Sequence, residues 1–171
     1  VEFANPAEAL RSGIAIIEQE LSPVPHMTVA ENIYLGREPS ARFGGIDFKT
    51  MNRNAQALLD RLEFSISATQ YMMNLSVAQM QLVEIAKALS HEADVIFMDE
   101  PTSAIGEKEA QHLFSAIKRL KAEGKGIVYV SHRLSEIFQI ADSYTVFRDG
   151  GFVGAGKLAD IDRPGLIRMI V

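Results

Sequence analysis

The feature that most constrains the fold of this chain is the run Val95-Ile96-Phe97-Met98, which is closed by two adjacent carboxylates, Asp99 and Glu100. Such a run is typical of a strand in the centre of a parallel sheet, and ligands bind at the carboxyl ends of these strands. There Asp99 can hold Mg²⁺ directly or through water, and Glu100 can orient or deprotonate an attacking water. The alternative is that both carboxylates are solvated residues that merely end a strand.

The rest of the chain alternates short apolar runs with amphipathic stretches, a pattern that predicts an α/β fold with a mostly parallel sheet. We expect a helical insertion at 28–89, a range with no convincing strand, although 22–45 is loop-rich. Apolar residues spaced by three and four predict helices near 51–62 and 113–120. The expected strands are Ile14–Glu18, Asp94–Met98, Gly126–Ser131 and Ser143–Arg148, with a hairpin strand Phe152–Ala155 after the turn Asp149-Gly150-Gly151.

The composition of the chain excludes some kinds of partner and binding site. The 171 residues carry a formal net charge of -5, with 22 acidic against 17 basic side chains, which argues against a nucleic-acid surface. The absence of cysteine excludes disulfides and thiolate metal sites. No apolar run is long enough to span a bilayer. We therefore expect one globular domain with no nucleic-acid partner.

Two further motifs lie at the ends of predicted elements. Ser76, in Leu75-Ser76-Val77-Ala78-Gln79, is a natural N-cap for an apolar helix, and the N–H groups of a helix start favour phosphate oxygens. A plain cap is the alternative. His132 follows the predicted strand Val128-Tyr129-Val130-Ser131, where an imidazole could touch a phosphate oxygen. The alternative there is a lone surface histidine.

The order and spacing of these motifs resemble the ATP-binding-cassette (ABC) ATPases, in which a signature sequence, a Walker B strand and a switch histidine follow one another. Gln19 matches the Q-loop glutamine of that family. The resemblance implies a P-loop NTPase core at 1–27 and 91–171, with a helical subdomain at about 28–90. It also implies ATP and Mg²⁺ as ligands. The implied roles are the metal for Asp99 and Gln19, the attacking water for Glu100, the γ-phosphate for His132, and ATP on the opposite domain for Ser76 and Gln79.

Three runs, Glu18–Leu21, Glu31–Arg37 and Gln79–Ala88, look like the first cassette of the tandem ATPases that serve ribose- or galactose-type importers. This likeness implies an ATP-hydrolysing subunit on the cytoplasmic side of the inner membrane. Its implied partners are membrane permease subunits, a second cassette and, indirectly, a periplasmic sugar-binding protein. Two alternatives stay open: a non-catalytic docking cassette, and a soluble ABC-family ATPase of DNA repair or translation.

Two positions depart from the family pattern. Val77-Ala78 replaces the usual pair of signature glycines, so added Cβ atoms crowd the approach to a phosphate. Gly106 stands where the family commonly has a D-loop aspartate. We expect the first departure to impair the site that this signature completes, and the second to weaken a contact across the dimer.

The phosphate-binding Walker A loop has no counterpart before Gln19. Gly151–Lys157 matches G-x-x-x-x-G-K, but Leu158 follows instead of Ser or Thr, so we do not expect a phosphate loop there. We expect the chain to begin downstream of that loop in a longer polypeptide. By itself it should be inactive, bind ATP weakly and self-associate, because loss of the loop segment bares a sheet edge and uncovers apolar side chains.

Overall fold

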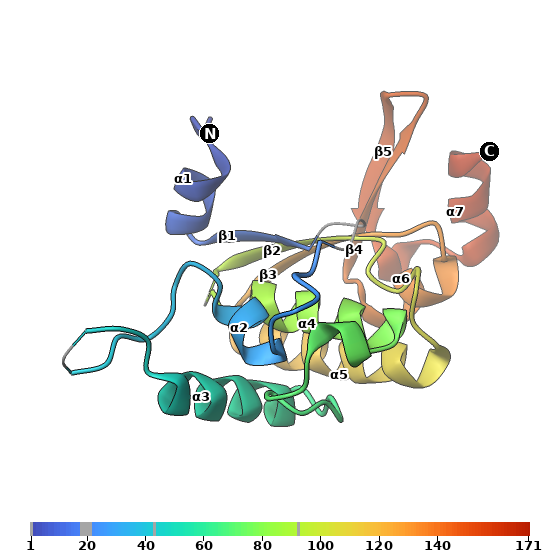
Figure 1. The fold of residues 1–171 in the computed structure, drawn as a ribbon. Helices are drawn as coiled ribbons and strands as arrows, with labels where there is room; N and C mark the ends of the chain where they lie inside the picture. The colour runs from blue at the N-terminus through green and yellow to red at the C-terminus, as the bar shows by residue number, and fades with distance from the viewer. Residues whose placement is uncertain (1, 18–21, 43, 92) are drawn as a thin grey trace. The chain divides into compact units, whose positions relative to one another are not determined.

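The computed structural model describes residues 2–17, 22–42, 44–91 and 93–171, which divide into two compact units, Val1–Val130 and Ser131–Val171. The first unit contains a parallel sheet of order β1-β2-β3 (Figure 1), built from Ile14–Ile17, Val95–Asp99 and Gly126–Val130. The strand inferred from the apolar run is thus the central one, β2. The predicted α/β class with a parallel sheet is confirmed.

The first unit has five helices and one 3-10 turn among its described residues. They are α1 (Pro6–Arg11), α2 (Val29–Tyr34), α3 (Phe48–Arg61), the 3-10 turn η1 (Met72–Asn74), α4 (Val77–Leu89) and α5 (Glu107–Ala122). In Figure 1, α4 and α5 lie on the same side of the sheet, where α4 contacts β1 and α5 contacts β3. No strand longer than an isolated bridge forms among the described residues of 28–89.

One short helix lies within the range 22–45, which was predicted to be loop-rich. The range 22–45 contains α2, whose N-cap Thr28 accepts a hydrogen bond from the N–H of Glu31 at 3.3 Å. The Glu31 carboxylate in turn accepts from the N–H of Thr28 at 2.7 Å, which completes a capping box. The range is loop-rich as predicted, since α2 is the only helix or strand among its described residues, and α2 lies within the helical insertion expected at 28–89. The exact place of this helix was not predicted. The spacing Thr-x-x-Glu was the signal that could have shown it.

The two faces of the parallel sheet differ in burial. Ala15, Ile17, Ile96 and Met98 alternate onto the face covered by helices, and Met98 is 0% exposed. On the other face Ile16, Phe97 and Val128 pair across the three strands in one row, and they are 60%, 39% and 41% exposed. Asp99, the last residue of β2, belongs by alternation to this exposed face.

The second unit is built on an antiparallel hairpin. Its elements are α6 (Leu134–Ile140), β4 (Ser143–Arg148), β5 (Gly151–Lys157), the 3-10 turn η2 (Leu158–Asp160) and α7 (Arg163–Ile170). Val146, Leu158 and Leu166 form its core. The hairpin turn is Asp149–Gly150, both with left-handed φ, so β5 begins at Gly151 and is longer than the predicted strand Phe152–Ala155.

The G-x-x-x-x-G-K segment forms strand β5 of this hairpin. A Cβ placed on Gly154 would lie 2.5 Å from Cε of Met169, and one on Gly156 would lie 3.1 Å from Oη of Tyr144. These glycines therefore allow close packing within the second unit. The prediction that the segment is not a phosphate loop is confirmed.

Candidate functional site

The chain direction changes at Glu100, directly after β2. Glu100 has a φ of 43°, in the left-handed region that non-glycine residues rarely adopt. Its N–H donates to the carbonyl oxygen of Val130 at 3.0 Å, and its own carbonyl accepts from the N–H of Ser103 at 3.0 Å. A left-handed residue of this kind costs about 1–3 kcal/mol and is enriched at functional sites. The turn is thus held in a strained form by the neighbouring strand β3.

The loop that follows separates apolar from acidic side chains. Pro101, Thr102 and Ile105 are buried, whereas Asp99 is exposed and Glu100 is half-buried. The buried residues fix the loop against the first unit and leave two carboxylates at the carboxyl end of a parallel sheet. In open α/β sheets this is the edge at which ligands bind.

The acidic pair fits one kind of metal binding. Over the described part of the chain, no group of three or more His, Cys, Asp or Glu side chains could hold a metal ion. Mg²⁺ is commonly bound by one or two carboxylates, with water and substrate phosphate oxygens filling the other positions. Asp99, with Glu100 beside it, suits that arrangement.

Ser76 and Gln79 come together at the start of α4. Oγ of Ser76 accepts from the N–H of Gln79 at 3.2 Å, and Oε1 of Gln79 accepts from the N–H of Ser76 at 3.0 Å. The predicted N-cap is confirmed, and the two side chains form a reciprocal capping box. The start of this 13-residue helix therefore presents partial positive charge next to an exposed hydroxyl.

The two positions that depart from the family pattern, Val77-Ala78 and Gly106, both lie at the starts of helices. The Val77 side chain is exposed in the first turn of α4, so it occupies space that glycine would leave open. Gly106 is the N-cap of α5 and supplies no side-chain cap. A Cβ on Gly106 would lie 2.8 Å from Oε2 of Glu109. An aspartate at this position would therefore require the Glu109 carboxylate to move.

His132 lies in the second unit and is exposed. Its two neighbours in the chain, Ser131 and Arg133, form a small polar network with Glu136. Oγ of Ser131 accepts from the N–H of Arg133 at 2.9 Å and donates to Oε2 of Glu136 at 3.1 Å, while Nη1 of Arg133 donates to Oε1 of Glu136 at 3.4 Å. Sequence reasoning missed Glu136. The signal was a carboxylate four residues before the buried Ile140, on a helical face where an apolar residue is expected.

The structure thus brings the predicted site residues together in two pairs, Asp99 with Glu100 and Ser76 with Gln79. Gln19 falls outside the described residues. The convergence of His132 and Gln19 on the acidic pair stays a prediction.

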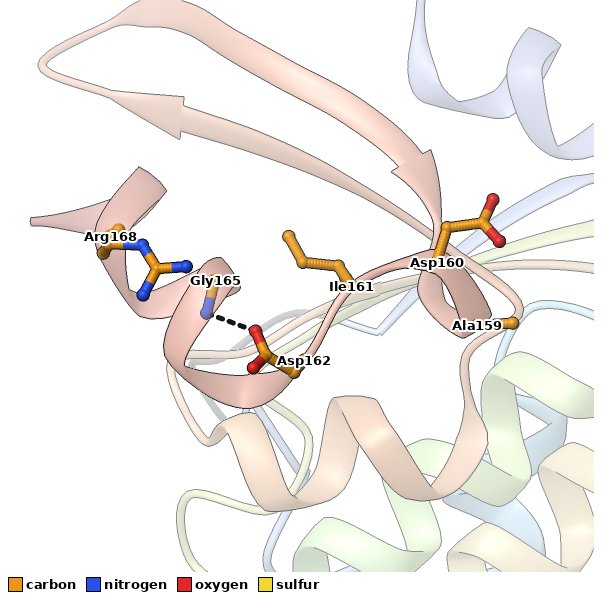
Figure 2. Close-up of a pocket in the computed structure, with 6 residues that line it drawn as sticks. All are labelled: Ala159, Asp160, Ile161, Asp162, Gly165 and Arg168. Atoms are coloured by element: carbon orange, nitrogen blue, oxygen red, sulfur yellow. Dashed lines mark hydrogen bonds between the residues drawn. The ribbon is translucent and has the colours of Figure 1, made fainter.

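A separate open pocket of about 660 Å³ lies in the second unit (Figure 2). Its lining residues are Ala159, Asp160, Ile161, Asp162, Gly165 and Arg168. Asp162 is the N-cap of α7 and accepts from the N–H of Gly165 at 2.8 Å (Figure 2), so its carboxylate has a structural role. None of the predicted site residues lines this pocket. Across the described residues, no helix has the length and apolar character required to cross a membrane.

The chain is similar to curated proteins over all of its 171 residues. A ribose/galactose/methyl galactoside import ATP-binding protein of Pseudomonas fluorescens is 52% identical, and proteins of the same description from Burkholderia cenocepacia and Rhizobium johnstonii are 50% and 49% identical. Each comparison covers 100% of this chain and 33% of the relative. The chain therefore spans about a third of the length of these relatives.

Solved structures show the same fold. A nucleotide-free ATP-binding cassette from an ABC transporter superposes with a TM-score of 0.77 at 26% identity, over 97% of this chain and 72% of that one. The ADP conformation of an ATP-binding cassette gives a TM-score of 0.76 at 26% identity, over 96% and 70%. The model of the family described as ABC transporter matches residues 2–103. This match, the import ATP-binding relatives and the shared fold establish that the chain belongs to the ABC transporter family of ATP-binding cassettes.

Proposed function

We propose that the complete subunit containing this cassette hydrolyses Mg-ATP and thereby energises a bacterial importer of a ribose- or galactose-type monosaccharide. The proposal assigns it membrane permease subunits and a second cassette as direct partners, and a periplasmic sugar-binding protein as an indirect one. It works on the cytoplasmic side of the inner membrane. The names of the relatives, which are import ATP-binding proteins for these sugars, support the substrate class.

The observation that carries the proposal is the acidic pair at the end of β2. Asp99 would hold Mg²⁺, and the metal would neutralise charge on the phosphate oxygens. Glu100 would accept a proton from the attacking water at a carboxylate oxygen. The strained backbone at Glu100 supports this role. It turns the chain immediately after Asp99, so the two neighbouring carboxylates can take different roles.

The other predicted residues would act on the same nucleotide chemistry. His132 would hydrogen-bond to a γ-phosphate oxygen, and Gln19 would help to hold the metal and the water. The exposed start of α4, with Ser76 and Gln79, would contact ATP bound to the opposite cassette. Helix N-termini favour phosphate oxygens, which supports this last assignment.

The test is Glu100→Gln in the complete subunit, assembled with its permease. The neutral amide cannot take a proton from water, so we expect kcat for ATP hydrolysis to fall by about 10²-fold or more while ATP binding is retained. Glu107→Gln is the matched control, because Glu107 is exposed in the first turn of α5 and has no assigned role. Equal loss in both variants would exclude Glu100 as the specific base.

A second candidate is a non-catalytic docking cassette, which the Val77-Ala78 signature and the Gly106 N-cap favour. It predicts that Glu100→Gln leaves ATP turnover unchanged. It also predicts that Val77→Gly with Ala78→Gly does not raise turnover. The importer proposal expects this double change to raise turnover, although two glycines in a first helical turn cost up to about 1 kcal/mol each.

A further inference from the structure

We infer that Glu136 is a positioning residue that fixes the backbone on both sides of His132. The inference rests on the proposed function, in which His132 contacts a phosphate oxygen. Glu136 itself is buried, with 7% of its surface exposed, and contacts no substrate in this proposal. It acts through Ser131 and Arg133, the two residues that flank His132.

The buried Glu136 carboxylate needs partners that compensate for its loss of water. A carboxylate removed from water is costly unless it is hydrogen-bonded or paired with a cation. Glu136 has both kinds of partner, because one oxygen accepts from the Ser131 hydroxyl at 3.1 Å and the other approaches the Arg133 guanidinium at 3.4 Å. These two contacts compensate for burial and at the same time bind both neighbours of His132 to one side chain on α6.

The hydrogen bonds of Ser131 restrain the backbone around His132. The Ser131 hydroxyl donates to Glu136 and accepts the N–H of Arg133 at 2.9 Å, so it closes a local turn around His132. The carboxylate therefore fixes the direction of the hydroxyl, and the hydroxyl fixes the peptide that follows His132. The N–H of Glu136 also donates to the carbonyl oxygen of Arg133 at 3.0 Å, which ties the start of α6 to the same turn.

The chemistry follows from this arrangement. A hydrogen bond from an imidazole to a phosphate oxygen requires the ring to be held within a fraction of an ångström of its productive place. His132 is exposed and lies outside the helices and strands. The network centred on Glu136 restrains the backbone on both sides of this residue.

The experiment compares Glu136→Ala, Glu136→Gln and Ser135→Ala in the complete subunit assembled with its permease. Ser135 is exposed on the same helix and serves as the matched control. Three quantities are measured for each protein: hydrogen exchange of the amides at 131–134, by mass spectrometry, and kcat and KM for ATP hydrolysis. Glu136→Ala should speed the exchange of this segment at least tenfold and lower kcat about tenfold, with KM within twofold. Glu136→Gln keeps one acceptor and should fall between wild type and the alanine variant.

The double variant Ser131→Ala with Glu136→Ala should lose no more kcat than Glu136→Ala alone, since both changes break the same network. Additive losses would overturn the inference, as would unchanged exchange at 131–134 in the glutamine variant and in a folded alanine variant. If His132→Ala does not slow hydrolysis, the proposed role of His132 fails. The exchange measurement then still decides whether Glu136 holds the turn, because it does not depend on catalysis.

Discussion

The two faces of the parallel sheet have the same apolar character and opposite environments. On one face Ile17 and Met98 are fully enclosed by helices that include α4 and α5, whereas on the other Ile16, Phe97 and Val128 form an exposed row. Parallel sheets are almost always covered on both faces, because their strands are apolar throughout. Association that covers the exposed row would therefore be favourable. Asp99 lies at the edge of this row.

The comparison also separates stability from function. The covered face ties β1, β2 and β3 to the helices and holds the end of β2 in place. The uncovered face carries the carboxylate that we assign to the metal. Changes on the first face should cost folding free energy, and changes on the second should alter association or chemistry at little cost to folding.

The largest effect is expected from Ile17→Ala, compared with Ile16→Ala on the same strand. Ile17 is 2% exposed, so its truncation leaves a cavity and should lower the free energy of unfolding by about 2–5 kcal/mol. Ile16 is largely exposed and should lose less than about 1 kcal/mol. Urea unfolding at low protein concentration measures both values. Equal losses would mean that the two faces are equally enclosed in solution.

An intermediate effect is expected on self-association, which we predict to occur between copies of this chain through the exposed row. Phe97→Ser removes the largest side chain of the row and should weaken association about tenfold or more, equivalent to about 1.4 kcal/mol. Sedimentation or light scattering at several concentrations reports the dissociation constant.

Phe152→Ser is the control for this prediction. Phe152 is an exposed phenylalanine of the hairpin, whose ring centroid lies 6.1 Å from that of Phe147. Loss of association in the Phe152 variant alone would place the contact on the hairpin and exclude the sheet face. A wild-type chain that stays monomeric at all concentrations would contradict self-association itself.

The smallest effect on folding is expected from Asp99→Asn. The Asp99 side chain is exposed at the end of β2, so the free energy of unfolding should change by less than about 0.5 kcal/mol. In the complete subunit the same change should markedly raise the Mg²⁺ concentration needed for half-maximal ATP hydrolysis. A large loss of stability with unchanged Mg²⁺ dependence would make Asp99 a structural residue and would reverse its assignment.

Local patterns predicted much of this molecule. The apolar run before Asp99 identified the central strand, and Ser76 before an apolar helix identified the cap of α4, because both signals depend on neighbours within a few residues. The exact place of α2 within 22–45 was not predicted, since a six-residue helix has few apolar positions and the Thr28–Glu31 capping box is its main signal. The hairpin strand was predicted in the correct place, but its predicted range was too short.

The sequence by itself determined the family, the order of the motifs and the identity of the acidic pair, because residue type and spacing carry that information directly. Only the tertiary structure decided the strained turn at Glu100, which depends on the carbonyl of Val130 in the next strand. The tertiary structure also decided which face of the sheet is exposed. The strands β1, β2 and β3 carry apolar residues on both faces, so the exposed face is the one that the helices leave uncovered. The burial of Glu136 beside Ser131 and Arg133 was also decided by the tertiary structure alone, because the partners of a carboxylate depend on which side chains the folded chain brings next to it.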